Sequence, residues 1–157
     1  MLKNLKHIIS NLVKVLLVSL IGGAVTAPAV RSWYNTLNKP MFNPPDWAFS
    51  LAWTILFILM AISAYLVNKR AQDKETSDRA IRIYDAQLFL NLLWSILFFG
   101  LRSPLLAFID VIFLWCAIVY TIKAFHKIYT PSAILLIPYI LWVTFAAILN
   151  LYIVLLN

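Results

Sequence analysis

Two apolar segments of the sequence carry amides and aromatic rings at spacings of three or four residues, which place them on one face of a helix. In the segment "YDAQLFLNLLWSILFFG" this stripe comprises Gln87, Asn91, Trp94 and Phe98. In the segment "PYILWVTFAAILNLY" it comprises Tyr139, Trp142, Ala146 and Asn150. Each segment therefore predicts a helix with an aromatic and amide stripe inside an otherwise apolar surface.

Polar side chains in an apolar helix need hydrogen-bonding partners, and two interpretations supply them. In the first, Gln87, Asn91 and Asn150 bond between helices, each contact contributing about 1 kcal/mol or less. In the second, the stripes face a pocket in which indole rings form the walls and a few amides orient a flat, largely apolar ligand. The residues alone leave both interpretations open.

No constellation of residues in the sequence indicates an acid–base or metal site. Asp110 is a carboxylate within an apolar run, and because no histidine or second carboxylate accompanies it, we expect a structural role. His7 and His126 both fall at the end of the molecule away from the aromatic stripes. The single cysteine, Cys116, has no partner for a disulfide and is expected to act as a small apolar residue. We therefore expect no catalytic residue and no metal ligand, and leave enzymatic activity open.

The composition predicts an all-α integral membrane protein. Of the 157 residues, 63% are hydrophobic and 12% are charged, which is too apolar for a soluble domain. We expect one membrane domain over residues 1–157, a five-transmembrane-helix bundle with spans at about 8–29, 45–67, 81–100, 104–125 and 132–155. Lys14 interrupts the first span and is expected to snorkel to the interface. This run resembles a signal peptide too, but we expect it to remain because the other spans need it as a packing partner.

The basic residues indicate the orientation of these spans. On one side of the membrane we place ten of them: Lys3, Lys6, Lys14, Lys69, Arg70, Lys74, Arg79, Arg82, Lys123 and Lys127. The other side holds Arg31, Lys39 and Arg102. Because basic residues favour the cytoplasmic side, the N-terminus is predicted to be cytoplasmic and the C-terminus outside. The net charge of +7 is thus a sign of topology, and we expect no nucleic-acid partner.

The connections between the spans differ in composition. Residues 68–80, "NKRAQDKETSDRA", predict a charged loop, whereas the outer loop 30–44 is rich in proline and aromatic residues. Pro44 and Pro45 suit the first turn of the second helix, Asn43 is expected to cap it, and Pro40 stiffens the approach. We interpret this loop as a rigid lid that brings Trp47 and Trp53 over the mouth of the bundle.

Three segments, in this order, resemble the TspO/MBR family of translocator proteins and bacterial tryptophan-rich sensory proteins. They are "WYNTLNKPMFNPPDWAFSLAW", "QLFLNLLWSILFFG" and "PYILWVTFAAILN". The resemblance implies a five-helix bundle, a homodimer, and a pocket that opens toward the first loop. It further implies binding of porphyrins such as protoporphyrin IX and of synthetic benzodiazepine-type ligands, with porphyrin as ligand and no cofactor required.

The same resemblance implies the residues of the site. The expected ligand-binding residues are Tyr34, Trp53, Asn91, Trp94, Trp142, Phe145 and Ala146. The expected residues of the lid are Trp33, Lys39, Pro40, Asn43, Pro44, Pro45 and Trp47. Arg31 or Lys39 is expected to meet the propionates of a porphyrin. Sterol binding is doubtful, because the sterol-associated pattern has Leu149 and Tyr152 but no basic residue after them.

The leading expectation for function is a receptor or sensor that binds porphyrins in a bacterial membrane. One alternative is an enzyme whose indole rings assist light- and oxygen-dependent breakdown of the porphyrin. The other is a transporter of porphyrin or lipid, although the sequence shows neither the internal repeats nor the broken helices typical of transporters.

Overall fold

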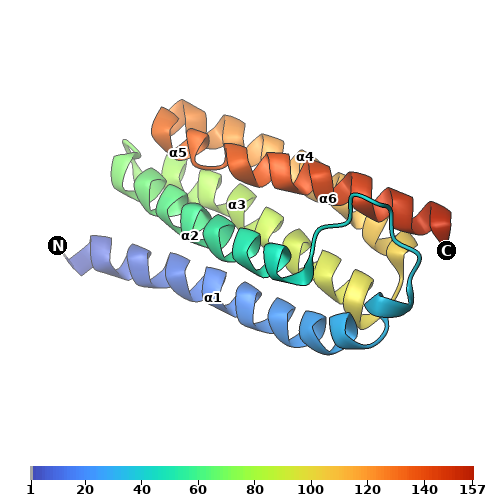
Figure 1. Cartoon of the computed structure of the whole chain (residues 1–157). Helices are drawn as coiled ribbons and strands as arrows, with labels where there is room; N and C mark the ends of the chain where they lie inside the picture. Colours follow the sequence, from blue (N-terminus) through green and yellow to red (C-terminus); the bar gives the residue numbers. More distant parts are fainter. Residues whose placement is uncertain (1) are drawn as a thin grey trace.

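The computed structural model describes residues 2–157, with side chains from Ile8 onward. The order of elements along the chain is α1 (Leu2–Arg31), η1 (Tyr34–Thr36), α2 (Asp46–Arg70), α3 (Lys74–Ser95), η2 (Ile96–Gly100), α4 (Pro104–Ile128), α5 (Thr130–Ile134) and α6 (Ile137–Leu156). The helices run nearly parallel or antiparallel to one another as a bundle, with η1 and the segment that follows it at one end (Figure 1). We call this end the loop side.

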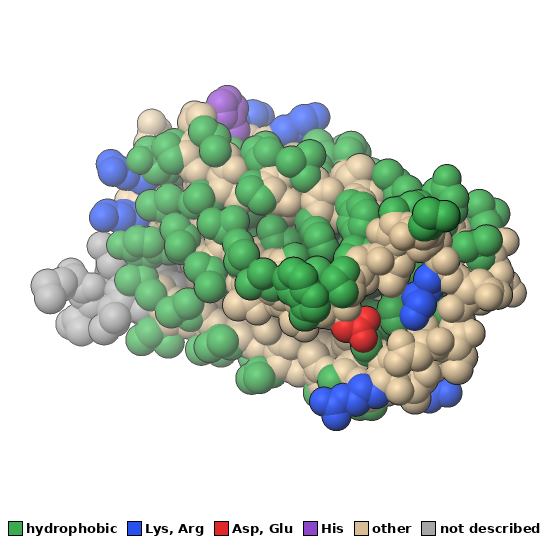
Figure 2. All heavy atoms as spheres, in the orientation of Figure 1, with side chains coloured by type: hydrophobic (Ala, Val, Ile, Leu, Met, Phe, Trp, Pro, Cys, Tyr) green, Lys and Arg blue, Asp and Glu red, His purple; other side chains and the backbone are tan. Residues whose placement is uncertain are grey.

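Five helical segments in the described residues are long and apolar enough to cross a membrane. They are Ile8–Arg31, Asp46–Arg70, Lys74–Gly100, Pro104–Ile128 and Thr130–Leu156. This confirms the predicted all-α membrane protein with five spans. Apolar side chains cover much of the face seen in Figure 2, and basic side chains are visible toward both ends of the molecule.

The centre of the bundle is formed by α4, which packs most extensively against α3 and α6. Its inward residue Ile118 is fully buried, as are Met60 and Ala64 of α2 and Tyr84 of α3. In contrast, α1 packs on α2, α3 and η2 and is the least buried of the spans. The first helix is thus attached to one flank of a tightly packed set of four (Figure 1).

The second helix begins differently from the prediction. Its N-cap is Pro45, in an extended conformation with ψ 152°, and no side chain caps its first turn. The predicted cap by Asn43 is wrong, because the Asn43 Oδ1 atom accepts a hydrogen bond from the Tyr34 hydroxyl at 2.6 Å. Asn43 therefore fixes the loop to Tyr34 instead of satisfying the amides of α2.

The predicted charged loop 68–80 is mostly helical. Its Asp73 side chain caps α3 by accepting a hydrogen bond from the Thr76 backbone N–H at 2.7 Å. This bond holds the pKa of the Asp73 carboxyl below its ordinary value. Because of the cap, α3 starts at Lys74, and only residues 71–73 connect it to α2.

Lys14 has a partner inside the bundle. Its Nζ atom lies 2.9 Å from Asp85 Oδ1 and 2.7 Å from Asp85 Oδ2, which joins α1 to α3. Both side chains are about one-third exposed. The expectation that Lys14 snorkels to the interface gave it no partner, whereas in the structure a carboxylate on the neighbouring helix neutralises its charge.

Candidate ligand-binding site

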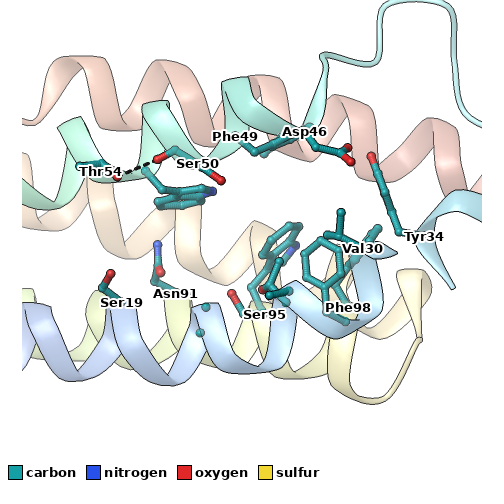
Figure 3. A pocket seen from close by; sticks show the side chains of 18 of the residues that line it. Ser19, Val30, Tyr34, Asp46, Phe49, Ser50, Thr54, Asn91, Ser95 and Phe98 are labelled. Atoms are coloured by element: carbon teal, nitrogen blue, oxygen red, sulfur yellow. Dashed lines mark hydrogen bonds between the residues drawn. The ribbon is translucent and has the colours of Figure 1, made fainter. Parts of the chain in front are cut away.

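A cavity of about 550 Å³ lies in the half of the bundle nearer the loop side. Its walls come from α1, α2, α3, η2 and α6. Figure 3 labels lining side chains of α1, α2, α3 and η2, together with Tyr34 of η1. This volume is within the range of roughly 300–1,000 Å³ that is typical of small-molecule sites. The cavity thus has the size of a ligand site and lies between the least buried helix and the packed core.

One wall of the cavity is aromatic. The Trp94 and Phe98 rings are stacked with their centroids 5.2 Å apart, and the Phe98 and Phe99 centroids are 4.7 Å apart. Tyr34 closes the group with a centroid 6.1 Å from that of Phe98. Trp53, on α2, also lines the cavity. These rings offer a broad apolar surface with π-faces, which suits flat unsaturated ligands.

The π-helical turn η2 explains how two consecutive aromatic residues line the cavity. The Leu101 N–H donates to the Ile96 carbonyl at 2.8 Å, which is an i to i+5 hydrogen bond. Such a bond widens the helix by one residue, and single π-turns are common at functional sites. Phe98 and Phe99 both contribute to the wall here.

The amides of the two stripes form hydrogen bonds between helices. Asn91 Nδ2 donates to the Tyr139 hydroxyl at 2.9 Å, and that hydroxyl donates to Gln87 Oε1 at 2.7 Å. A second network starts at Trp94 Nε1, which donates to Asn150 Oδ1 at 3.1 Å. Asn150 Nδ2 in turn donates to the Pro104 carbonyl at 2.8 Å and so reaches α4.

Both interpretations of the stripes therefore describe part of the geometry. Gln87 and Tyr139 lie wholly in the interhelical network, where they are about 1% exposed. Asn91, Trp94 and Asn150 bond between helices and also line the cavity. The network consequently fixes the orientation of the aromatic wall.

Another wall is formed by small and hydroxyl-bearing residues of α1. It includes Ser19, Gly22, Gly23 and Thr26. A Cβ atom added at Gly22 would lie 3.6 Å from Ser95 Oγ, so α1 and α3 approach closely there. A Cβ added at Gly23 would meet nothing within 4 Å. The space beside Gly23 is therefore open to any group that occupies the cavity.

The mouth of the cavity lies at the loop side and carries polar groups. Arg31, from the last turn of α1, and Asp46, from the first turn of α2, line it with Tyr34. Tyr34 is only 3% exposed, and burial, followed by the nearby charge of Asp46, raises the pKa of its hydroxyl to about 12, against a smaller lowering by the hydrogen bond to Asn43. Figure 3 shows the Asp46 carboxylate directed toward this hydroxyl.

The loop over the mouth is held at both of its sides. Lys39 Nζ donates to the Tyr34 carbonyl at 3.2 Å and lies 4.6 Å from the centroid of the Tyr34 ring. Farther along, the Asn38 N–H donates to Asn157 Oδ1 and Asn157 Nδ2 donates to the Asn38 carbonyl, each at 3.0 Å. The C-terminal end of α6 thereby holds the loop in place.

The structure brings part of the expected site together around the cavity. The expected residues that line it are Tyr34, Trp47, Trp53, Asn91, Trp94 and Ala146. The expected residues that do not line it are Trp33, Lys39, Pro40, Asn43, Pro44, Pro45, Trp142 and Phe145. Trp142 contacts Phe49, which lines the cavity, with the two ring centroids 5.8 Å apart, and Phe145 packs against Trp142 with centroids 5.5 Å apart. Trp142 can therefore affect a ligand in the cavity through its contact with Phe49.

Several residues of the cavity were not among the expected ones. They are Ser19, Gly23, Thr26, Asp46, Phe49, Ser50, Ser95 and Phe99, among others, whereas Arg31 was expected as a partner for a propionate. A helical period applied to the run 15–29 could have grouped Ser19, Gly22, Gly23 and Thr26 on one face. The π-turn that directs Phe99 inward has no comparable signal in the sequence. Asp110 is 5% exposed, and its Oδ2 atom has no hydrogen-bonding partner among the described residues.

The fold and the cavity define a class of protein, namely a multi-pass α-helical membrane protein of five spans with an aromatic-walled internal cavity. The model of the TspO/MBR family matches residues 11–156. The chain therefore belongs to the TspO/MBR family.

Relatives with high similarity extend over most of the chain. A tryptophan-rich protein TspO of Chlorobaculum tepidum is 43% identical over 86% of both chains. A tryptophan-rich protein TspO of Archaeoglobus fulgidus is 38% identical over 98% of this chain and 99% of its own. A tryptophan-rich sensory protein of Cereibacter sphaeroides is 40% identical over 82% of this chain and 77% of its own.

Proposed function

We propose that the protein is a membrane receptor or sensor that binds porphyrins, such as protoporphyrin IX, in the cavity beneath the loop. The observation that carries this proposal is the stacked aromatic wall of Trp94, Phe98 and Phe99 beside a cavity of about 550 Å³. A porphyrin is a flat π-system, and offset stacking on such rings contributes beyond the burial of apolar area. The name of the Cereibacter sphaeroides relative, a sensory protein, is consistent with this role.

The polar groups of the cavity suggest how a porphyrin would be oriented. The macrocycle would lie between Trp53 and the aromatic wall, with one propionate at the mouth. There Arg31 can form a charge-assisted hydrogen bond to a carboxylate. Lys39, the alternative partner expected from the sequence, is already bonded to the Tyr34 carbonyl.

The placement of the protein in its membrane is part of this proposal. The basic residues at the N-terminal end of α3 and at the C-terminal ends of α2 and α4 favour a cytoplasmic location for that end. The mouth would then open on the outer side of a bacterial membrane. We include a homodimer in the proposal, and crosslinking in native membranes would test it.

A titration of the purified protein in detergent with protoporphyrin IX tests the proposed function. We expect saturable quenching of tryptophan fluorescence, because Trp53 and Trp94 line the cavity. Gly23→Leu should weaken binding at least tenfold, since the new side chain enters open space in the cavity. Ala24→Leu is the matched control on the same helix, at an exposed position outside the cavity, and should bind as the wild type does.

Two results would contradict the proposed function. One is quenching that does not saturate, as expected for partition into the detergent micelle. The other is equal affinity of Gly23→Leu and Ala24→Leu.

Photochemical breakdown of the porphyrin is a second candidate, favoured by the three indole rings of Trp47, Trp53 and Trp94 at the cavity. Illumination of the complex in oxygen should then change the porphyrin absorbance faster than illumination of free porphyrin. Trp53→Phe should abolish that difference if the indole takes part. Equal rates with and without the protein would leave binding as the function.

A further inference from the structure

The mouth of the cavity carries two opposite charges that have no ion-pair partner among the described residues. Arg31 and Asp46 both line the cavity and both are exposed. The two salt bridges found in residues 8–157 lie elsewhere, and join Lys14 to Asp85 and Arg79 to Glu75. One guanidinium and one carboxylate are therefore available to a ligand that enters from the loop side.

A structural role for these charges is the obvious alternative. A cation in the last turn of a helix and an anion in the first turn both complement the helix dipole. Arg31 and Asp46 fit this rule. The rule does not account for their position on the cavity, where the Asp46 carboxylate is directed toward the hydroxyl of Tyr34 (Figure 3).

The arrangement of charges limits which polar groups the mouth accepts. Among residues 8–157, Arg31 is the only basic residue that lines the cavity, and Lys39 is bonded to the Tyr34 carbonyl outside it. A ligand with two carboxylates could therefore pair only one of them. The second carboxylate would lie near Asp46, and like charges in proximity oppose binding.

We propose that the cavity selects amphipathic ligands with a zwitterionic polar end, whose acid group binds Arg31 and whose cationic nitrogen binds Asp46. This inference rests on the proposed function and defines the ligand class of the same cavity. Two sources share the required chemistry, an apolar body with one acid and one ammonium group. They are a tetrapyrrole that bears both groups and a zwitterionic phospholipid with an ethanolamine head group.

Three porphyrins with one macrocycle test the role of the charges. They are protoporphyrin IX with two carboxylates, its neutral dimethyl ester, and its monoamide with ethylenediamine, which has one carboxylate and one ammonium group. We expect the wild type to bind the monoamide about three- to fivefold more tightly than the diacid, a ratio typical of partly exposed charge pairs. Asp46→Asn should remove this preference by strengthening binding of the diacid. Arg31→Gln should weaken binding of the diacid and of the monoamide, which both carry a carboxylate, and leave binding of the dimethyl ester unchanged.

Matched variants separate ligand recognition from general electrostatics and from helix stability. Asp78→Asn and Arg102→Gln change the net charge equally at residues outside the cavity, and should keep the order of affinities of the wild type. A purely structural role would lower the melting temperature of Asp46→Asn and leave that order unchanged. The proposal is overturned if wild type and Asp46→Asn rank the three porphyrins alike.

A separate experiment with lipids decides whether the ligand is a phospholipid or a tetrapyrrole. Spin-labelled phosphatidylethanolamine and phosphatidylglycerol are compared as quenchers of tryptophan fluorescence in nanodiscs. Stronger quenching by the ethanolamine lipid, lost in Asp46→Asn, assigns the site to a phospholipid. If the two lipids quench the fluorescence equally and the protein still prefers the monoamide to the diacid, the site is assigned to a tetrapyrrole. If no porphyrin binds, the proposed function fails, and equal quenching by the two lipids then overturns this inference as well.

Discussion

The ion pair between Lys14 and Asp85 predicts that removal of one partner destabilises the protein more than removal of the other. Lys14 is six residues inside the span that begins at Ile8, which is about 9 Å along the helix at 1.5 Å per residue. Half of the hydrocarbon core is about 15 Å. The pair therefore lies between the interface and the midplane, where an unpaired charge costs less than the roughly 2.5–3.5 kcal/mol measured at the centre.

Lys14 and Asp85 differ in how far each can move when its partner in the ion pair is removed. In Asp85→Asn the long side chain of Lys14 can snorkel toward the interface, so we expect the free energy of unfolding to fall by about 1 kcal/mol. In Lys14→Met the short carboxylate of Asp85 stays in place, and we expect a loss of about 2 kcal/mol. The double variant removes both charges and should lose only about 1 kcal/mol, giving a coupling energy of about 2 kcal/mol.

Unfolding in mixed micelles with increasing dodecyl sulfate, followed by circular dichroism, measures all four proteins. Arg79→Gln and Glu75→Gln are the control cycle, because that pair is largely exposed and should couple by less than about 0.5 kcal/mol. The reasoning is refuted if the losses at Lys14 and Asp85 add, or if Asp85→Asn is the more damaging of the two single variants.

Three further predictions concern the loop side. Arg102 has φ 52°, in the left-handed region, so Arg102→Gly should raise the free energy of unfolding by about 1 kcal/mol in the same assay. A fall would contradict this. Asn157→Ala removes both hydrogen bonds to Asn38, and hydrogen exchange in residues 37–45 should accelerate about tenfold, whereas unchanged exchange would show that the loop is held by other contacts. Because burial raises the pKa of Tyr34 to about 12, the stability from its protonated form is complete below pH 10 and is lost as the pH rises toward 12. The phenolate absorbance of wild type minus Tyr34→Phe should titrate near pH 12, and a midpoint near 10 would refute the burial.

The spans and the membership of the two polar stripes could be predicted because they depend on local patterns. Apolar runs of the right length gave the five helices, and helical spacing grouped Gln87 with Asn91 on α3 and Tyr139 with Asn150 on α6. The two stripes do meet in hydrogen bonds. Trp142 belongs to the same stripe but lies outside the lining of the cavity, at an edge where it contacts Phe49 of α2. Spacing along one helix does not show which neighbour occupies that edge.

The features that the sequence did not predict depend on contacts between distant segments. Lys14 and Asp85 are 71 residues apart, and Asn38 and Asn157 are 119 apart. Asp85, Asn38 and Asn157 carried no signal of these contacts in their own segments, and Lys14 stood out only because it interrupts the first span. Asn43 was assigned to the nearest helix by the general rule for caps, yet the hydroxyl of Tyr34 is the partner that it contacts. Knowledge of the helix arrangement was needed to choose between such partners.

The locked state of the aromatic wall has a consequence for the thermodynamics of binding. Trp94 is fixed by its bond to Asn150, and Phe98 is in contact with the rings of Trp33, Tyr34, Trp94 and Phe99. Side chains that are already immobile lose little conformational entropy when a ligand arrives, so less of the contact energy is spent on ordering them. Calorimetry should therefore find association driven by enthalpy, with a negative change in heat capacity from the buried apolar surface.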